Sequence, residues 1–398
     1  MSRVDLAIED FETAVNELQK EDFKCVLALT GGGSLAISSL LSFGGSSNIF
    51  LEAIVPYDSK ALVNFLGVTP EKFCSDKTAR LMAVRSFQRA VALGTDKTKA
   101  IGVGVSASLA KKGKERDGRV HEAFLAIQGY KSAISVHMVF PKGFTRLQEE
   151  WGTATMVFTL LGHILNVVDD QQDIADVIKL ANGKFKYKRV DDNLGLADVI
   201  LLDEKIKVLS GGFDEVPTKS GIFPGSFNPP HTGHVRIIKN AKQEKGLEDK
   251  PIFLELSVDN VDKPSLDMFD VYDRIEVIQR DEGLSGEIAG VVVTRAKRFY
   301  EKTLLFSSPT FLIGSDTANR IVDRSYYDDD LHYYGELSTM RLYGANFLVF
   351  ERLGVPFSDK INELKHRIVD GHKDEGESSS DIRKSQDNGG CGCSCEHS

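Results

Sequence analysis

Apolar residues in the first 168 positions fall into short runs that alternate with helical repeats. Residues 4–20 have the spacing of an amphipathic helix, and Lys24–Leu29 form a largely apolar run typical of a buried strand. A glycine-rich turn at 31–34 opens another helical run. Further strands are predicted at 48–55, 99–106, 121–128 and 132–140, and further helices at 58–66, 75–93 and 143–167. This alternation predicts a mixed α/β domain over residues 1–168.

A second α/β pattern follows a connector that we place at 169–215 and that is polar at first, then partly apolar. Strands separated by single helices favour a parallel sheet, so we predict one for the domain at 216–384. After Gly371 the residues become polar and rich in Gly, Ser and Asp, which predicts disorder, and 385–398 form a Cys-rich tail. Its strands are predicted at 221–227, 252–258, 289–294, 310–315 and 346–352, and its helices at 231–243 and 268–280.

The composition narrows the class of protein. A net charge of −9 argues against a general nucleic-acid binder, which needs a basic face. No apolar run approaches the roughly 20 residues of a membrane-spanning helix. The acidic, amphipathic first residues resemble neither a secretory signal nor a transit peptide. The five cysteines form no disulfide framework. We therefore expect a cytoplasmic protein whose partners include neither nucleic acid nor membrane.

The strongest chemical signal is the segment 225–234, GSFNPPHTGH, between a predicted strand and a predicted helix. Gly225 lets the backbone pass close to a phosphate chain, and the N–H groups at the helix start attract the same anion. His231 and His234 are three residues apart, so both project from one side of the first helical turn, and Gly233 leaves room between them. Two imidazoles facing a phosphate can donate hydrogen bonds to the charge that develops in a transition state.

These residues resemble the HxGH box of the nucleotidylyltransferase superfamily, and the resemblance covers about residues 219–384. It implies a Rossmann-like parallel sheet and catalytic roles for His231 and His234. It also implies in-line attack of a substrate phosphate on the α-phosphate of a nucleoside triphosphate, with Mg²⁺ on the departing pyrophosphate and no covalent intermediate. The expected partners are thus a nucleoside triphosphate and a phosphorylated small molecule. The nucleotide-binding positions of the box are Gly225, Ser226, Phe227 and Gly233.

Two further segments stand in the order that the family has. Lys263 follows the second strand and Arg274 lies on the next helix, where relatives place phosphate-binding cations; the resemblance makes Lys263 catalytic. Both residues also fit solvated surface charges. Gly314 and Asp316 resemble the family's GxD segment, which lies beside the nucleotide. Asp316 also fits the N-cap of a helix that starts at Thr317.

A third segment, SSSDIR at 378–383, resembles the family's ISSTxIR box. The resemblance implies that Ser379, Ser380 and Arg383 bind the triphosphate, because hydroxyls, N–H groups and a guanidinium together form a compact anion site. Glu377 replaces the usual Ile of the box, and the flanking sequences HKDEGE and SQDNGG instead fit a Ser-rich tail.

The N-terminal half resembles the C-terminal domain of the CinA family, which is a nicotinamide mononucleotide deamidase. The resemblance rests on Thr30-Gly31-Gly32, on GGSS at 44–47 with Tyr57 after it, and on SDKTARLMA at 75–83. The family's glutamate and serine in ESCTGG are Leu27 and Ala28 here.

The catalytic positions of this first domain are therefore degenerate. An amidase needs an activated nucleophile, and Ala28 cannot serve as one. Ser34 and Ser106 remain as substitutes, and the family's lysine is Leu62. We expect the domain to be non-catalytic, as a pocket, a dimerisation surface or a regulatory module.

Several alternatives stay open at the level of sequence. The favoured activity transfers AMP from ATP to nicotinamide or nicotinate mononucleotide. The alternatives are a cytidylyltransferase, phosphocholine or phosphopantetheine transfer, and a nucleotide-binding sensor with weak or no catalysis. The tail at 391–395, CGCSC, offers soft ligands but lacks CxxC spacing, so we predict no protein metal site. A homo-oligomer also stays open.

Overall fold

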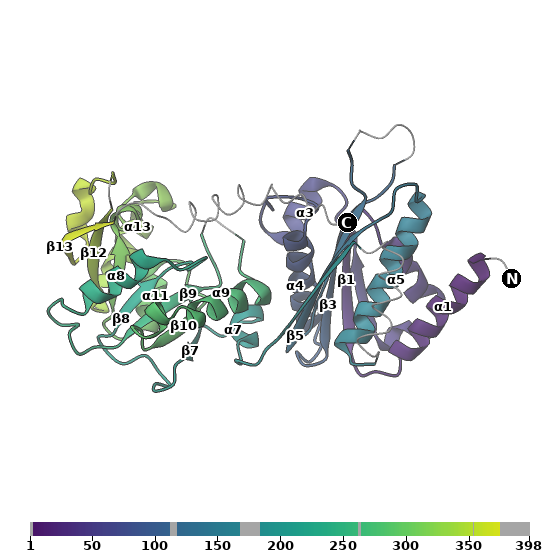
Figure 1. Ribbon diagram of the computed structural model, residues 1–398, viewed down its shortest axis with the longest axis horizontal. Coiled ribbons are helices and arrows are strands. Elements are labelled where there is room, and N and C mark those ends of the chain that lie inside the picture. The colour runs from purple at the N-terminus through teal and green to yellow at the C-terminus, as the bar shows by residue number, and fades with distance from the viewer. Residues whose placement is uncertain (1–2, 112–117, 168–183, 262–263, 353, 375–398) are drawn as a thin grey trace, which may run out of the picture. The chain divides into compact units, whose positions relative to one another are not determined.

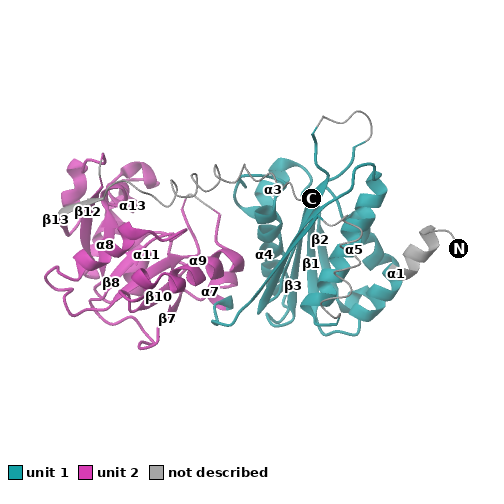
Figure 2. Cartoon of the chain, in the orientation of Figure 1, with its two compact units in different colours: residues 1–197 teal, residues 198–398 magenta. Residues whose placement is uncertain are grey.

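The computed structural model describes residues 3–111, 118–167, 184–261, 264–352 and 354–374. The chain divides into two compact units, residues 1–197 and 198–398 (Figure 2). Each unit is built on its own β-sheet (Figure 1). None of the helices in the described ranges has the length and apolar character that crossing a bilayer requires.

The first unit is a six-stranded mixed sheet with the strand order β2-β1-β3-β4-β5-β6. Strand β1 pairs in parallel with β2 and β3, and the pairs from β3 to β6 are antiparallel. The strands are β1 (Lys24–Thr30), β2 (Phe50–Ile54), β3 (Ala100–Ser108), β4 (Glu122–Gln128), β5 (Ser132–Val139) and β6 (Phe185–Asp191). The helices are α1 (Arg3–Leu18), α2 (Ser34–Ser42), the 3₁₀ turn η1 (Ser46–Asn48), α3 (Ser59–Leu66), α4 (Asp76–Ala92) and α5 (Arg146–Ile164).

Helix α4 packs directly on β3 because β3 has glycines where the two elements meet. A Cβ at Gly102 would lie 2.1 Å from the carbonyl oxygen of Ala83, and one at Gly104 would lie 2.1 Å from that of Ala79. No side chain tolerates such contacts with backbone. The sequence AIGVGVS therefore predicts a strand, while its glycines allow the close approach of a helix.

The second unit is a seven-stranded sheet with the order β13-β12-β11-β8-β9-β10-β7. All its pairs are parallel except β7 with β10, so the predicted parallel sheet carries one antiparallel edge strand. The strands are β7 (Ile206–Leu209), β8 (Gly221–Pro224), β9 (Ile252–Ser257), β10 (Gly290–Thr294), β11 (Thr310–Gly314), β12 (Asn346–Arg352) and β13 (His366–Asp374). The helices are α7 (Ala197–Leu201), α8 (Thr232–Ala241), α9 (Met268–Arg280), α10 (Glu282–Ser285), α11 (Phe299–Leu305), α12 (Ser315–Ile321), η2 (Arg324–Tyr326), α13 (Asp330–Leu342) and η3 (Asp359–Glu363).

The central strands of this sheet are buried on both faces. Phe311 and Ile313 of β11 join one apolar cluster, and the intervening Leu312 is also fully buried. Such strands read as continuous apolar runs, which is why TFLIG and NFLVF were recognisable in the sequence.

Two boundaries differ from the sequence prediction. The segment placed as a connector at 169–215 supplies β6 to the first sheet and β7 to the second. The region expected to lose order after Gly371 still contains the end of β13, which continues to Asp374. In both cases polar residues form strands because a neighbouring strand supplies backbone partners. The predicted tail at 385–398 lies outside the described residues.

Candidate active site

The segment 225–234 lies at the carboxyl edge of the second sheet, where its strand order reverses. From β8 the chain passes outward through β9 to β10, then crosses to β11 on the other side of β8 and continues to β12 and β13. Open α/β sheets bind ligands outside the carboxyl ends of the strands at such a switch point. The printed pairing of β8 with β11 ends at Ile222 with Phe311, before the carboxyl ends of the two strands.

Phe227 shapes the loop that leaves β8. Its side chain is buried, its backbone has a φ of 45°, and its ring packs against Phe223 and His234 at centroid distances of 5.6 and 5.1 Å. The ring also folds back over Gly225, where a Cβ would lie 2.6 Å from it. Gly225 is therefore required by this ring as well as by its predicted approach to phosphate. Phe227 is a core residue that supports the histidines.

His231 and His234 come together at the start of α8, as their spacing predicts. Their ring centroids are 3.8 Å apart, and the backbone N–H of His231 donates to Nδ1 of His234 at 3.0 Å. Gly233 between them is buried. Burial, followed by the proximity of His231, lowers the pKa of His234 from 6.5 to about 3. His234 is therefore neutral near pH 7, and because Nδ1 accepts a hydrogen bond, its proton lies on Nε2. That N–H is the group available to donate to a substrate oxygen.

Arg274 reaches the same loop from α9. Its guanidinium donates to the carbonyl oxygen of Ser226 at 3.2 Å, and the residue is partly exposed. Ser226 itself is exposed. The contact gives Arg274 a fixed position beside the loop, which distinguishes it from a freely solvated surface charge.

The GSD segment lies at the end of β11, the neighbour of β8. Helix α12 begins at Ser315 with Gly314 as its N-cap, so the interpretation of Asp316 as an N-cap is wrong. Asp316 instead lies 3.7 Å from the guanidinium of Arg352 at the end of β12. The buried Ser315 hydroxyl accepts a hydrogen bond from the Arg352 N–H at 3.2 Å. Sequence reasoning missed Arg352, because only the pairing of β11 with β12 brings it there.

A buried ion pair underlies the site. The carbonyl of Glu255 on β9 accepts the Gly225 N–H at 3.1 Å. The Glu255 carboxylate accepts from Lys302 Nζ at 2.7 and 2.8 Å and from the Thr294 hydroxyl at 2.5 Å. Lys302 also donates to the Ala296 carbonyl at 3.0 Å. The buried charges are thus matched and hydrogen-bonded, and they tie α11 to β9 and β10.

The remaining predicted site residues fall outside the part of the chain that the structure describes. These residues are Lys263, Ser379, Ser380 and Arg383. Their assignments therefore remain predictions. Within the described ranges, no three His, Cys, Asp or Glu side chains gather closely enough to bind a metal by themselves.

In the first unit the positions of the absent amidase residues lie inside the core. Leu27 and Ala28 are fully buried in β1. The buried Ser106 hydroxyl donates to the Phe73 carbonyl at 2.8 Å. Ser34 is exposed, but its N–H and that of Gly33 donate to the Glu150 carboxylate at 3.1 and 2.7 Å. The start of α2 is thus already filled by an anion from the protein itself.

Comparison with known proteins locates one family in the chain. The cytidylyltransferase-like family model matches residues 222–385. A search of curated protein sequences gives no significant match.

Several solved structures resemble parts of the chain at low identity. Competence/damage-inducible protein CihA from Agrobacterium tumefaciens is 22% identical, covers 40% of this chain and 96% of its own, and has a TM-score of 0.33. A CinA-superfamily protein from Escherichia coli is 15% identical over 42% and 94%, also with a TM-score of 0.33. Plasmodium falciparum nicotinic acid mononucleotide adenylyltransferase, complexed with NaAD, is 14% identical over 42% and 83%, with a TM-score of 0.31. Residues 222–385 of this chain therefore form a cytidylyltransferase-like domain.

Proposed function

We propose that the second unit transfers AMP from ATP to the phosphate of nicotinate or nicotinamide mononucleotide and releases pyrophosphate. The cytidylyltransferase-like domain supports a nucleotidyltransferase activity in general. The observation that carries the proposal is the pair His231 and His234 at the start of α8, with His234 neutral and its Nε2 proton available. The choice of a pyridine mononucleotide rests on the GSFNPPHTGH box and on the resemblance of the N-terminal half to a deamidase of that nucleotide.

In the proposed reaction an oxygen of the acceptor phosphate attacks the α-phosphorus of ATP. A new P–O bond forms on one side while the bond to the β-phosphate bridging oxygen breaks on the other, and both electrons leave with pyrophosphate. The N–H groups at the start of α8 and the two imidazoles donate to the α-phosphate oxygens, where charge builds up. No protein nucleophile is needed, because positioning and charge neutralisation carry this chemistry.

Mg²⁺ is part of the proposal as a companion of the nucleotide. Mg²⁺ is commonly bound through substrate phosphates, water and one or two carboxylates, and so needs no protein cage. That agrees with the lack of a three-ligand group in the described residues. When bound, the ion would neutralise charge on the departing pyrophosphate.

The direct test is pyrophosphate release by the full chain from ATP or CTP, with a panel of acceptors. We expect release with ATP and nicotinate or nicotinamide mononucleotide, and none when the acceptor is omitted. Phosphocholine and phosphopantetheine complete the panel. Turnover with either of these or with CTP alone would replace the proposed substrates, and binding without turnover of any pair would favour a sensor.

A second prediction concerns the segment 378–383, whose role in binding triphosphate is inferred from sequence. Arg383→Ala should raise the KM for ATP about 10- to 100-fold, since a hydrogen bond to a charged group contributes about 1.5–3 kcal/mol. Truncation after Gly371 should do the same, although it also removes the end of β13. Truncation after Lys384 is the matched control and should leave activity near normal. Equal effects of the two truncations would contradict the assignment.

A further inference from the structure

The turn between β10 and α11 carries three cations, Arg295, Lys297 and Arg298, at the edge of the sheet where the histidines lie. Parallel strands put their carboxyl ends at one edge, and β10 is the second strand from β8. Since neighbouring strands are about 4.8 Å apart, β10 lies roughly 10 Å from β8. The turn therefore flanks the proposed reaction centre on the side opposite β11.

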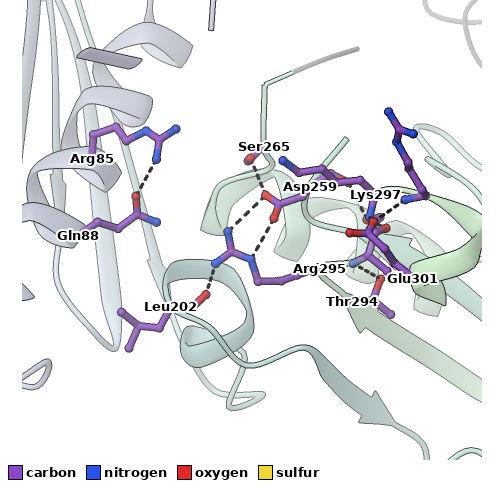
Figure 3. Close-up of polar contacts among 12 residues, drawn as sticks. Arg85, Gln88, Leu202, Asp259, Ser265, Thr294, Arg295, Lys297 and Glu301 are labelled. Carbon is purple, nitrogen blue, oxygen red and sulfur yellow. Dashed lines mark hydrogen bonds and ion pairs between the residues drawn. The ribbon is translucent and has the colours of Figure 1, made fainter. Parts of the chain in front are cut away.

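The two arginines of the turn are engaged by the protein itself. Arg295 donates to the Asp259 carboxylate, with Nε 3.0 Å from Oδ2, and to the carbonyl of Leu202 (Figure 3). Arg298 lies 2.6 Å from the Glu336 carboxylate. Each arginine thus has a carboxylate partner, and neither is needed to explain ligand binding.

Lys297 differs from its neighbours because its charge has no such partner. Its side chain is exposed, and its ammonium makes no hydrogen bond or ion pair with another residue in the described ranges. The backbone beneath it is fixed, since the N–H groups of Lys297 and Arg298 both donate to Oε2 of Glu301 at 2.7 Å. Figure 3 shows the side chain extending from the turn towards Asp259 and Ser265.

Asp259 does not use up the charge of Lys297. Burial by itself would raise the pKa of Asp259, but hydrogen bonds from Ser265 and Arg295, with the charges of Arg295 and Lys297, lower it below its ordinary value. The carboxylate is therefore ionised, and Arg295 and Ser265 occupy its oxygens at 3.0 and 2.6 Å. Lys297 is held on a rigid turn with an ammonium that can meet an anion from solution.

In-line displacement decides which substrate reaches this turn. The attacking and leaving oxygens lie on opposite sides of the α-phosphorus, so acceptor and pyrophosphate occupy opposite flanks of the centre. The predicted triphosphate box at 378–383 follows β13, on the β11 side. That places the acceptor on the β10 side. Its phosphate must come within about 3.5 Å of the centre near β8, so the group near Lys297 is the far end of the acceptor, its pyridine ring.

We propose that Lys297 binds the pyridine carboxylate of nicotinate mononucleotide, so that the enzyme prefers the acid to the amide as acceptor. This inference rests on the proposed function and names the acceptor within it. Both mononucleotides carry the same phosphate and ribose, and only the acid has a second anion for an ammonium to pair with. An amide at that position loses the charge-assisted hydrogen bond.

The test compares the two acceptors in the full chain with ATP saturating. Wild type should have the higher kcat/KM with nicotinate mononucleotide. Lys297→Ala and Lys297→Gln should lower kcat/KM for the acid by about 10-fold or more, leave that for nicotinamide mononucleotide within about twofold, and leave the KM for ATP unchanged. Lys297→Arg should retain most of the preference. Lys250→Ala is the control, because Lys250 is an exposed lysine just before β9, at the opposite edge of the sheet.

The outcomes separate this inference from the function on which it rests. Equal losses for both acceptors would place Lys297 at the shared phosphate and overturn the proposal, as would an unchanged ratio in Lys297→Ala. Calorimetric binding of the two mononucleotides to wild type and Lys297→Gln gives the same comparison without turnover. If wild type neither binds nor converts either mononucleotide, the proposed function fails, and the inference fails with it.

Discussion

Replacing His234 by alanine is expected to reduce kcat for pyrophosphate release by about 100-fold or more, because it removes a preorganised donor aimed at the charge of the transition state. His231→Ala should have an effect of the same order. The KM for ATP should change much less than kcat, since the donor acts mainly in the transition state. Steady-state kinetics with each variant measure both constants.

The control for this prediction is His332→Ala, which removes an exposed histidine of α13 that pairs with Asp329. It should leave kcat within about twofold. A thermal melt of each variant shows whether the loss comes from unfolding. Unchanged kcat in both His231→Ala and His234→Ala would exclude the proposed chemistry.

The protonation state of His234 gives this prediction a pH signature. Its pKa in the folded protein is about 3, so it stays neutral from pH 8 down to about pH 5. An ordinary histidine would gain a proton near pH 6.5 over this range. The dependence of kcat on pH should therefore show no acid limb near 6.5 that disappears in His234→Ala. Such a limb would show that His234 is more solvated than its surroundings in the structure require.

The second large effect is expected on stability. Lys302→Met should destabilise the second unit by about 3–5 kcal/mol, because it leaves the Glu255 carboxylate buried without its cation. The double variant Glu255→Gln with Lys302→Met should recover much of the loss, since it removes both charges. Lys250→Met, at an exposed position, should change stability by no more than about 0.5 kcal/mol.

The chain has two units, so the measurement must report on each of them. Hydrogen exchange of the amides of β9 and α11 reports opening of the second unit. The single tryptophan, Trp151, lies on α5 in the first unit, so its fluorescence transition should be unaffected and serves as the internal control. A Lys302→Met variant as stable as wild type would mean that the pair contributes nothing to this fold.

The sequence by itself determined the elements with strong periodicity and the segment that carries the chemistry. The apolar runs of β1, β3, β9 and β11 are strands buried on both sides, and such runs are short enough to be distinguished from helices. The box at 225–234 was identified for the same reason. Its glycines, prolines and histidines constrain backbone and chemistry locally, at a strand–helix junction that neighbouring residues predict.

Only the tertiary structure decided the pairings that link distant segments. Strand β6 (FKYKRVD) and the end of β13 (GHKD) are polar, and they are strands because an adjacent strand supplies their hydrogen bonds. Arg352 meets Asp316 because β11 and β12 are neighbours. No local pattern encodes either contact, since backbone pairing places few demands on side chains at a sheet edge.

The electrostatics of the site were likewise decided by the tertiary structure. The sequence shows two histidines three residues apart, but only the burial of His234 beneath the loop makes it neutral and fixes its proton on Nε2. The sequence also shows Arg295, Lys297 and Arg298 as one basic run. Folding pairs the two arginines with carboxylates on other elements and leaves Lys297 exposed, because the position of each partner depends on the packing of the whole sheet.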